Sequence, residues 1–181
     1  DGNSVVTIED CNFIQNGNIF VLGNGTLIMR DCSLVLNQTT SYQLRIETRS
    51  SARIICQNVN ISSNYSFDQY FFGSQANFTT TRWTNYIDTQ CNIISVVDSY
   101  ATGRFFVDNS GSFIDSVLDE AIVTQAMSTS HVLIKDSILD SSIIYVEDTN
   151  LIGANLNAGF ISYFNSLTDL IIIDGTPSNL T

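Results

Sequence analysis

The stretch Ile8-Glu9-Asp10-Cys11-Asn12-Phe13 recurs 21 residues later as Met29-Arg30-Asp31-Cys32-Ser33-Leu34. Both copies follow one pattern: an apolar residue, a variable one, Asp, a small residue, a variable one and a second apolar residue. The pattern returns at 134–139 (IKDSIL) and 146–151 (VEDTNL), with degraded copies at 54–59 (IICQNV) and 172–175 (IIDG). Self-similarity at a short, roughly constant spacing is typical of stacked-repeat architectures.

A second apolar segment lies between successive copies of this pattern, at 19–22, 43–46, 104–107 and 160–163. Repeats this short bury an apolar face only by stacking, each strand on its counterpart in the next coil at about 4.8 Å. The Asp-plus-small element suits a tight turn, and the outward positions beside it are charged: Glu9, Arg30, Lys135 and Glu147. We therefore predict one all-β domain over 1–181, a right-handed parallel β-helix of about six to seven coils, each of roughly 21 to 26 residues. An antiparallel β-sandwich would explain the alternation of apolar residues but not the recurring motif.

The strings VTIEDCNFIQNG, LIMRDCSLVLN and VLIKDSILDSS resemble the coils of right-handed parallel β-helix proteins, the pectate-lyase-like group that includes phage tailspikes and prokaryotic secreted and cell-surface proteins. The resemblance covers most of the chain. It implies a fold and no single activity, because the group contains lyases, hydrolases, adhesins and structural proteins.

Two regions depart from the repeat. Residues 62–103 are rich in aromatic side chains and are interpreted as an excursion from the solenoid. Residues 116–127 predict a short helix, with Ser116 as its cap and Val117, Leu118, Ala121 and Ile122 on one face.

Composition limits the choice of partners and compartment. The net charge is −11, and Lys135 is the only lysine, so repulsion disfavours nucleic acid and anionic membranes. No segment offers the roughly 18 consecutive apolar residues of a membrane-spanning helix. The chain opens on Asp1 without Met, which predicts processing from a longer precursor. An acidic, lysine-poor chain fits an extracellular or cell-surface location.

Four cysteines have spacings that predict disulfides. Cys11 and Cys32 occupy the same motif position one repeat apart, and neighbours in adjacent coils lie within the roughly 4.4–6.8 Å Cα window of a disulfide. Cys56 and Cys91 remain as a second pair, or as a bridge between subunits. Buried free thiols are the alternative.

Six N-x-[ST] sequons predict glycosylation, five of them within the first 77 residues. The acceptor asparagines are Asn24, Asn37, Asn60, Asn64, Asn77 and Asn179.

The aspartates that recur at the motif position are better explained by turns than by catalysis: Asp10, Asp31, Asp136 and Asp148. The resemblance to β-helix hydrolases implies Asn-Thr-Asp, Asp-Asp, Gly-His-Gly and Arg-Ile-Lys motifs. None of the four occurs here, and the only histidine, His131, opens a strand without flanking glycines. Asp108-Asn109 and Asp119-Glu120 could supply oxygen ligands to a structural calcium ion, which is a weak signal without a dedicated loop. We expect no catalytic residues and no cofactor.

The sequence therefore predicts a secreted or cell-surface structural protein that self-associates into a layer, sheath or filament. Its strand edges, or an apolar patch of Phe71, Phe72 and Trp83, would mediate the contacts. The alternative is a carbohydrate-binding or carbohydrate-cleaving β-helix, such as an adhesin or tailspike module. Two close carboxylates ringed by aromatic residues would favour that alternative.

Overall fold

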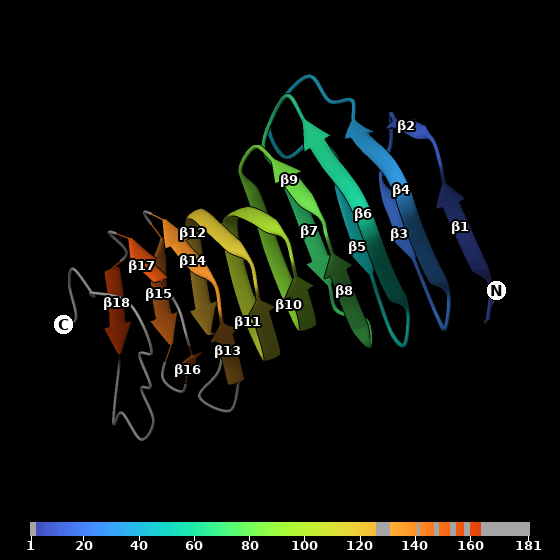
Figure 1. Ribbon diagram of the computed structural model, residues 1–181. Coiled ribbons are helices and arrows are strands. Elements are labelled where there is room, and N and C mark those ends of the chain that lie inside the picture. Colours follow the sequence, from blue (N-terminus) through green and yellow to red (C-terminus); the bar gives the residue numbers. More distant parts are fainter. Residues whose placement is uncertain are drawn as a thin grey trace.

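The chain forms one β-solenoid whose strands pair in parallel with strands of the neighbouring coils (Figure 1). The structure, a computed structural model, describes residues 3–125, 131–140, 142–146, 149–152, 155–157 and 160–163. All regular secondary structure in these residues is β-strand. The predicted parallel solenoid is confirmed, and the antiparallel sandwich is excluded for the described chain. The motif copy at 172–175 lies outside the described residues.

Each coil contributes a strand to three faces, which we call A, B and C. Face A stacks, in order, β1 (Val5–Glu9), the first halves of β4 (Thr26–Leu36) and β6 (Arg53–Ser63), β8 (Gln75–Thr79), the ends of β10 (Ile87–Val97) and β11 (Tyr100–Ile114), β13 (His131–Lys135) and β16 (Thr149–Ile152). Face B stacks β2 (Asn12–Gln15), the second halves of β4 and β6, β9 (Arg82–Thr84), the starts of β11 and β12 (Val117–Gln125), β14 (Ile138–Asp140) and β17 (Asn155–Asn157). Face C stacks β3 (Ile19–Val21), β5 (Arg45–Thr48), β7 (Phe67–Phe71), the start of β10, the middle of β11, the end of β12, β15 (Ile143–Val146) and β18 (Phe160–Tyr163).

Coil length varies more than the sequence pattern suggests. Stacked residues are 27 positions apart at Asp31 and Asn58 but only 17 apart at Ser99 and Ser116. The predicted range of 21 to 26 residues is therefore too narrow. The corner between faces A and B keeps the same short connection throughout, so the other two corners absorb the difference.

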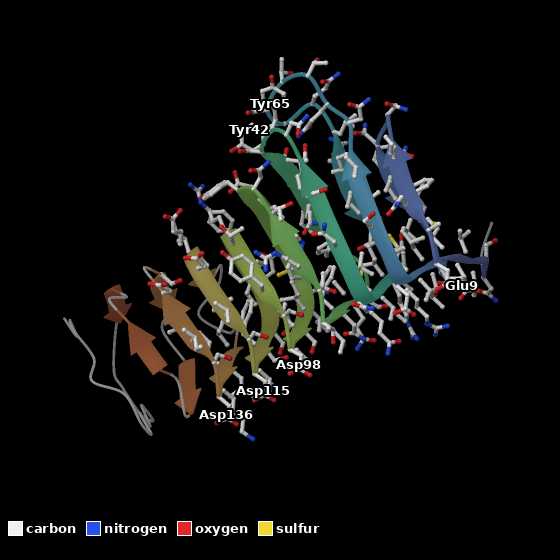
Figure 2. All side chains as sticks on the ribbon, turned by 45° about the horizontal axis from the view of Figure 1, so that its top comes forward. Glu9, Tyr42, Tyr65, Asp98, Asp115 and Asp136 are labelled. Carbon is white, nitrogen blue, oxygen red and sulfur yellow. The ribbon has the colours of Figure 1, made fainter. Side chains whose placement is uncertain are left out.

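The corner between faces A and B is turned by one residue per coil in the left-handed conformation. These residues have φ between 48° and 53°: Asp10, Asp31, Asn58, Thr80, Asp98, Asp115 and Asp136. Asp and Asn adopt this conformation more readily than other non-glycine residues. Their backbones stack from coil to coil, for example through the Asp98 N–H donating to the Ile114 carbonyl at 3.1 Å. Figure 2 shows Asp98, Asp115 and Asp136 in line along this edge. The turn interpretation of the aspartates is confirmed for the described coils, and Asp148 lies outside them.

Directly after this corner, a hydroxyl ladder runs through the interior. The N–H of Ser99 donates to Oγ of Ser116 at 3.2 Å, and the N–H of Ser116 donates to Oγ of Ser137 at 3.2 Å. The Ser116 hydroxyl in turn donates to the carbonyl of Ile114 at 2.8 Å. The left-handed turn leaves a buried N–H without a strand partner, and the serine of the next coil accepts it. In the coils of Ser99, Ser116 and Ser137, this is the physical reason for the serine after the corner aspartate.

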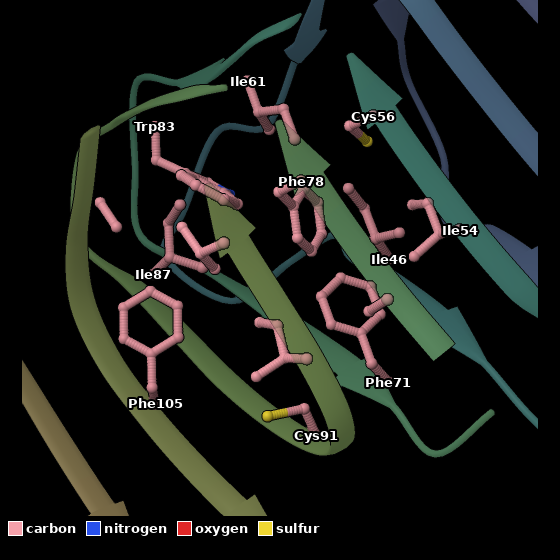
Figure 3. Close-up of a cluster of buried hydrophobic side chains, with 14 of the residues drawn as sticks. Ile46, Ile54, Cys56, Ile61, Phe71, Phe78, Trp83, Ile87, Cys91 and Phe105 are labelled. Atoms are coloured by element: carbon pink, nitrogen blue, oxygen red, sulfur yellow. The ribbon is translucent and has the colours of Figure 1, made fainter. Parts of the chain in front are cut away.

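The aromatic segment at 62–103 is not an excursion, which corrects the sequence interpretation. It forms β7 to β10 and joins all three faces in the same parallel pairing. Its rings fill the interior (Figure 3): Phe78 lies 5.5 Å from Phe71 and 4.8 Å from Trp83 between ring centroids. Large rings at inward positions obscure the motif in these coils without breaking the stack.

The helix predicted at 116–127 is also wrong, because Val117–Gln125 form strand β12, and residues 126 and 127 lie outside the described residues. Ser116 is the hydroxyl-ladder residue, not a helix cap. Leu118 and Ala121 both point inward at a helix-like spacing of three because Glu120 between them turns a corner, with φ of 48°. The corner residue interrupts the two-residue alternation of the strand, so two inward residues fall three positions apart, as they would on one face of a helix.

Replacing Ser116 with alanine tests the hydroxyl ladder. The variant leaves the buried N–H of Ser99 without its acceptor, so the free energy of unfolding should fall by about 1–3 kcal/mol. Urea unfolding followed by circular dichroism measures the loss. Ser110→Ala, on the exposed side of β11, is the matched control. Equal effects of the two substitutions would contradict a role for the ladder.

Candidate functional site

The most distinctive group of polar side chains lies on the outer surface of face C. In successive coils, Arg45 is paired in register with Asp68, Asp68 with Asp88, and Asp88 with Arg104. Neighbouring rungs of a parallel stack are about 4.8 Å apart. The column therefore places two carboxylates side by side with an arginine at each end, so that its formal charges cancel.

Tyrosines hydrogen-bond both carboxylates. The Tyr70 hydroxyl donates to Asp68, and the Tyr42 hydroxyl donates to Asp88. Burial raises the pKa of Asp68 above its ordinary value, the Tyr70 hydrogen bond opposes this rise, and the neighbouring Asp88 charge adds to it. Arg104 Nε lies 3.7 Å from Asp88 Oδ1. The pair is thus partly desolvated and held at fixed positions.

A loop at 37–44 carries Tyr42 to this column. Gln38 is buried and donates through Nε2 to the carbonyl of Tyr65 at 2.8 Å, while its Oε1 accepts the N–H of Leu44 at 3.0 Å. The Tyr42 N–H donates to the Ser66 carbonyl at 2.7 Å. Gln38 therefore ties two corner loops together, and Figure 2 shows Tyr42 and Tyr65 on the part that protrudes from the solenoid.

A second column on face C combines aromatic rings with one buried carboxylate. The Glu47 side chain is 2% exposed and forms ion pairs with Arg45, at 2.9 Å, and with Arg49. The Arg45 guanidinium lies over the Phe20 ring at 5.3 Å, and the rings of Tyr70 and Phe72 stack at 5.8 Å. Face C can therefore offer carboxylate acceptors, guanidinium donors and ring faces to one ligand.

The predicted apolar patch does not exist as a surface. Phe71 and Trp83 are each 1% exposed and belong to the core, whereas Phe72 is 40% exposed on face C. Phe71 is the last residue of β7 and Phe72 follows it directly, so the two side chains point to opposite sides of the sheet. Only Phe72 is available for contacts.

All four cysteines are free thiols, which corrects the predicted disulfides. Cys11 and Cys32 do fall in adjacent coils beside the same corner, as predicted from their spacing. Cys56 and Cys91 do not form a pair: Cys56 stacks on Met29 and Phe78 in face A, and Cys91 is in face C. Burial raises the pKa of both Cys56 and Cys91 well above the ordinary thiol range, so both are poor nucleophiles.

Four of the predicted glycosylation acceptors are exposed: Asn24, Asn37, Asn60 and Asn64. Asn77 is half-buried in the middle of face A, and Asn179 lies outside the described residues. Modification at these sites stays a prediction.

The residues considered for calcium lie apart. Asp119 is on face B and accepts the Tyr100 hydroxyl, whereas Asp108 follows the face C strand and accepts Gln90 Nε2 at 3.4 Å. Within the described part of the chain, no three or more His, Cys, Asp or Glu side chains are grouped as metal ligands would be.

Sequence reasoning missed the Asp68–Asp88 pair. The two residues are 20 positions apart, which is one coil, and that spacing was a usable signal. The aromatic residues around them suggested an irregular segment, so the register was not extended through it.

The Asp68 environment can be tested by titration. NMR should give Asp68 a pKa above its ordinary value of 3.8. A carboxyl whose pKa is raised by folding favours the folded state at low pH, and this contribution is lost as the pH rises through the folded pKa. Asp88→Asn should lower the Asp68 pKa by removing a like charge, and Tyr70→Phe should raise it by removing a hydrogen bond. Shifts in the reverse directions would contradict the geometry.

No protein-family model matches the chain, and no curated protein or solved structure matches it significantly. Among the described residues, no helix is long and apolar enough to span a membrane. A function must therefore be argued from the arrangement of side chains, since a solenoid fold serves many functions.

Proposed function

We propose that the protein is a secreted or cell-surface structural solenoid that self-associates. The observation that supports this function best is the unbroken stacking on all three faces, with hydrogen bonds from each coil to the next along the described chain. Such a stack is a stiff rod with flat sheet surfaces, suited to a layer, sheath, filament or shaft.

The charge and the surface support an extracellular setting. The chain has a net charge of −11 with seven Lys and Arg residues, and four sequon asparagines are exposed. The resemblance of its coils to those of prokaryotic secreted β-helix proteins points the same way.

Self-association should depend on salt. Each chain carries net negative charge, and repulsion between such chains is screened over about 8 Å at physiological ionic strength. The scattering mass should therefore rise above 20.0 kDa with protein concentration, and rise further from low to moderate NaCl. Static light scattering measures this. A constant monomer mass across both series would contradict self-association.

A second candidate function is carbohydrate binding on face C. The Asp68–Asp88 pair with Tyr42 and Tyr70 meets the criterion set out above, two close carboxylates with aromatic neighbours. Because the arginines balance both charges, the surface suits a neutral sugar better than an acidic one. Carboxylates and guanidinium groups would bond its hydroxyls, and the rings would stack on its apolar faces.

Affinity electrophoresis in neutral polysaccharides tests this candidate. Asp88→Asn and Tyr42→Phe should each weaken retardation at least several-fold, because both change the hydrogen bonds at the pair. Asp136→Asn, at the corner between faces A and B, is the control. Equal migration with and without polysaccharide would exclude the candidate. Release of oligosaccharides that stops in Asp68→Asn would show cleavage and overturn the expectation of no catalysis.

A further inference from the structure

The outer surface of face A differs in charge from the rest of the molecule. The middle outward position of its strands is uncharged in every coil from β1 to β13: Thr7, Ile28, Ile55, Asn77, Ser95, Ser112 and Leu133. The charged outward residues of these strands are Glu9, Arg30, Arg53 and Lys135. In a chain of net charge −11, this face carries more positive than negative charge.

We propose that face A is the surface through which two copies of the chain pack against each other. This inference rests on the proposed self-association and names its surface and partner. Two acidic molecules can approach closely only where like charges do not meet. The uncharged middle column provides such a seam, with β-branched and small polar side chains that suit aligned packing of two sheets at about 10 Å.

The charges at the edge of the face fix the relative orientation. A twofold axis along β8 places β1 opposite β13 of the second copy, β4 opposite β11, and β6 opposite β10. Glu9 and Lys135 both occupy the last outward position before the A–B corner, in β1 and β13. Each Glu9 then faces the partner's Lys135, while Arg30 faces the partner's Ile114. This orientation pairs opposite charges twice and opposes no like charges.

The centre of the face has an unsatisfied polar atom. Asn77 Oδ1 is buried and has no hydrogen-bond partner among the described residues. Asn77 lies in β8, on the proposed axis, so its side chain would face the partner's Asn77. Because Oδ1 is buried within its own chain, the amide group has to turn outward before Oδ1 accepts the partner's amide N–H. The arrangement requires Asn77 to be free of glycan.

The area of the face predicts a weak complex. Strand and rung spacings give about 500 Å² per molecule between Thr7 and Leu133. Stable interfaces bury about 800 Å² per partner. The dimer should therefore be reversible and should dissociate on dilution.

Charge exchange across the interface tests the orientation. Sedimentation equilibrium at about 50 mM salt, where surface ion pairs are screened less than at physiological ionic strength, gives the dimer dissociation constant. Glu9→Lys places two lysines opposite each other and should raise this constant several-fold. Lys135→Glu should do the same with two glutamates. The double variant restores opposite charges and should return the constant to within about threefold of the unmodified protein.

Two further variants complete the test. Ser95→Glu adds a charge to the seam and should raise the dissociation constant at least tenfold. Glu120→Lys changes the net charge as Glu9→Lys does, but away from face A, and should not weaken the dimer. Circular dichroism checks folding, since all of these side chains point outward or lie at a corner.

The outcomes separate the two proposals. A protein that self-associates without responding to Ser95→Glu or to the charge exchange would overturn the face A interface and leave the proposed function standing. A protein that stays monomeric at every concentration and salt would overturn both.

Discussion

The structure depends on one constraint: each coil must return to the same lateral position so that its backbone pairs with the coil before it. The corner between faces A and B meets this constraint with a single residue in the left-handed conformation. Where that residue is Asp or Asn, the strain is small. The serine that follows in coils such as those of Ser99 and Ser116 accepts the N–H that the turn would otherwise leave buried and unpaired. A polar pair of residues thus fixes the register of an apolar core.

Once one corner is fixed, the rest of the coil can vary. The separation between stacked residues ranges from 16 to 27 positions, and the loop at 37–44 is one result of this freedom. The interior adapts to the same extent. Rings at Phe71, Phe78 and Trp83 fill the space in the coils where the sequence motif is weakest. Core packing there needs the correct volume and an inward position, and it does not need the motif.

Stacking also brings residues that are one coil apart in the sequence next to each other, in columns along the solenoid. A residue on the outer surface has as its nearest neighbours the residues one coil before and after it, so charge has to be considered along a column. Asp68 and Asp88 become adjacent in this way. Burial is the main reason why the pKa of Asp68 is raised, and repulsion from the Asp88 charge adds to it. The same geometry leaves the middle of face A uncharged in a strongly acidic chain. Both surfaces arise from register, and neither forms a continuous motif in the sequence.

The sequence by itself determined the parallel solenoid, the turn role of the motif aspartates and the outward positions of Glu9, Arg30 and Lys135. The turns and the outward positions are local, because each depends on backbone preference and alternation within about six residues. The solenoid follows from the recurrence of that local pattern along the chain. Only the tertiary structure decided that 62–103 continues the stack, that 117–125 is strand, that Phe71 and Trp83 are core, and that Cys56 and Cys91 lie on different faces. These depend on coil length, which the variable corners set. A shift of one residue in a strand moves a side chain from the interior to the surface.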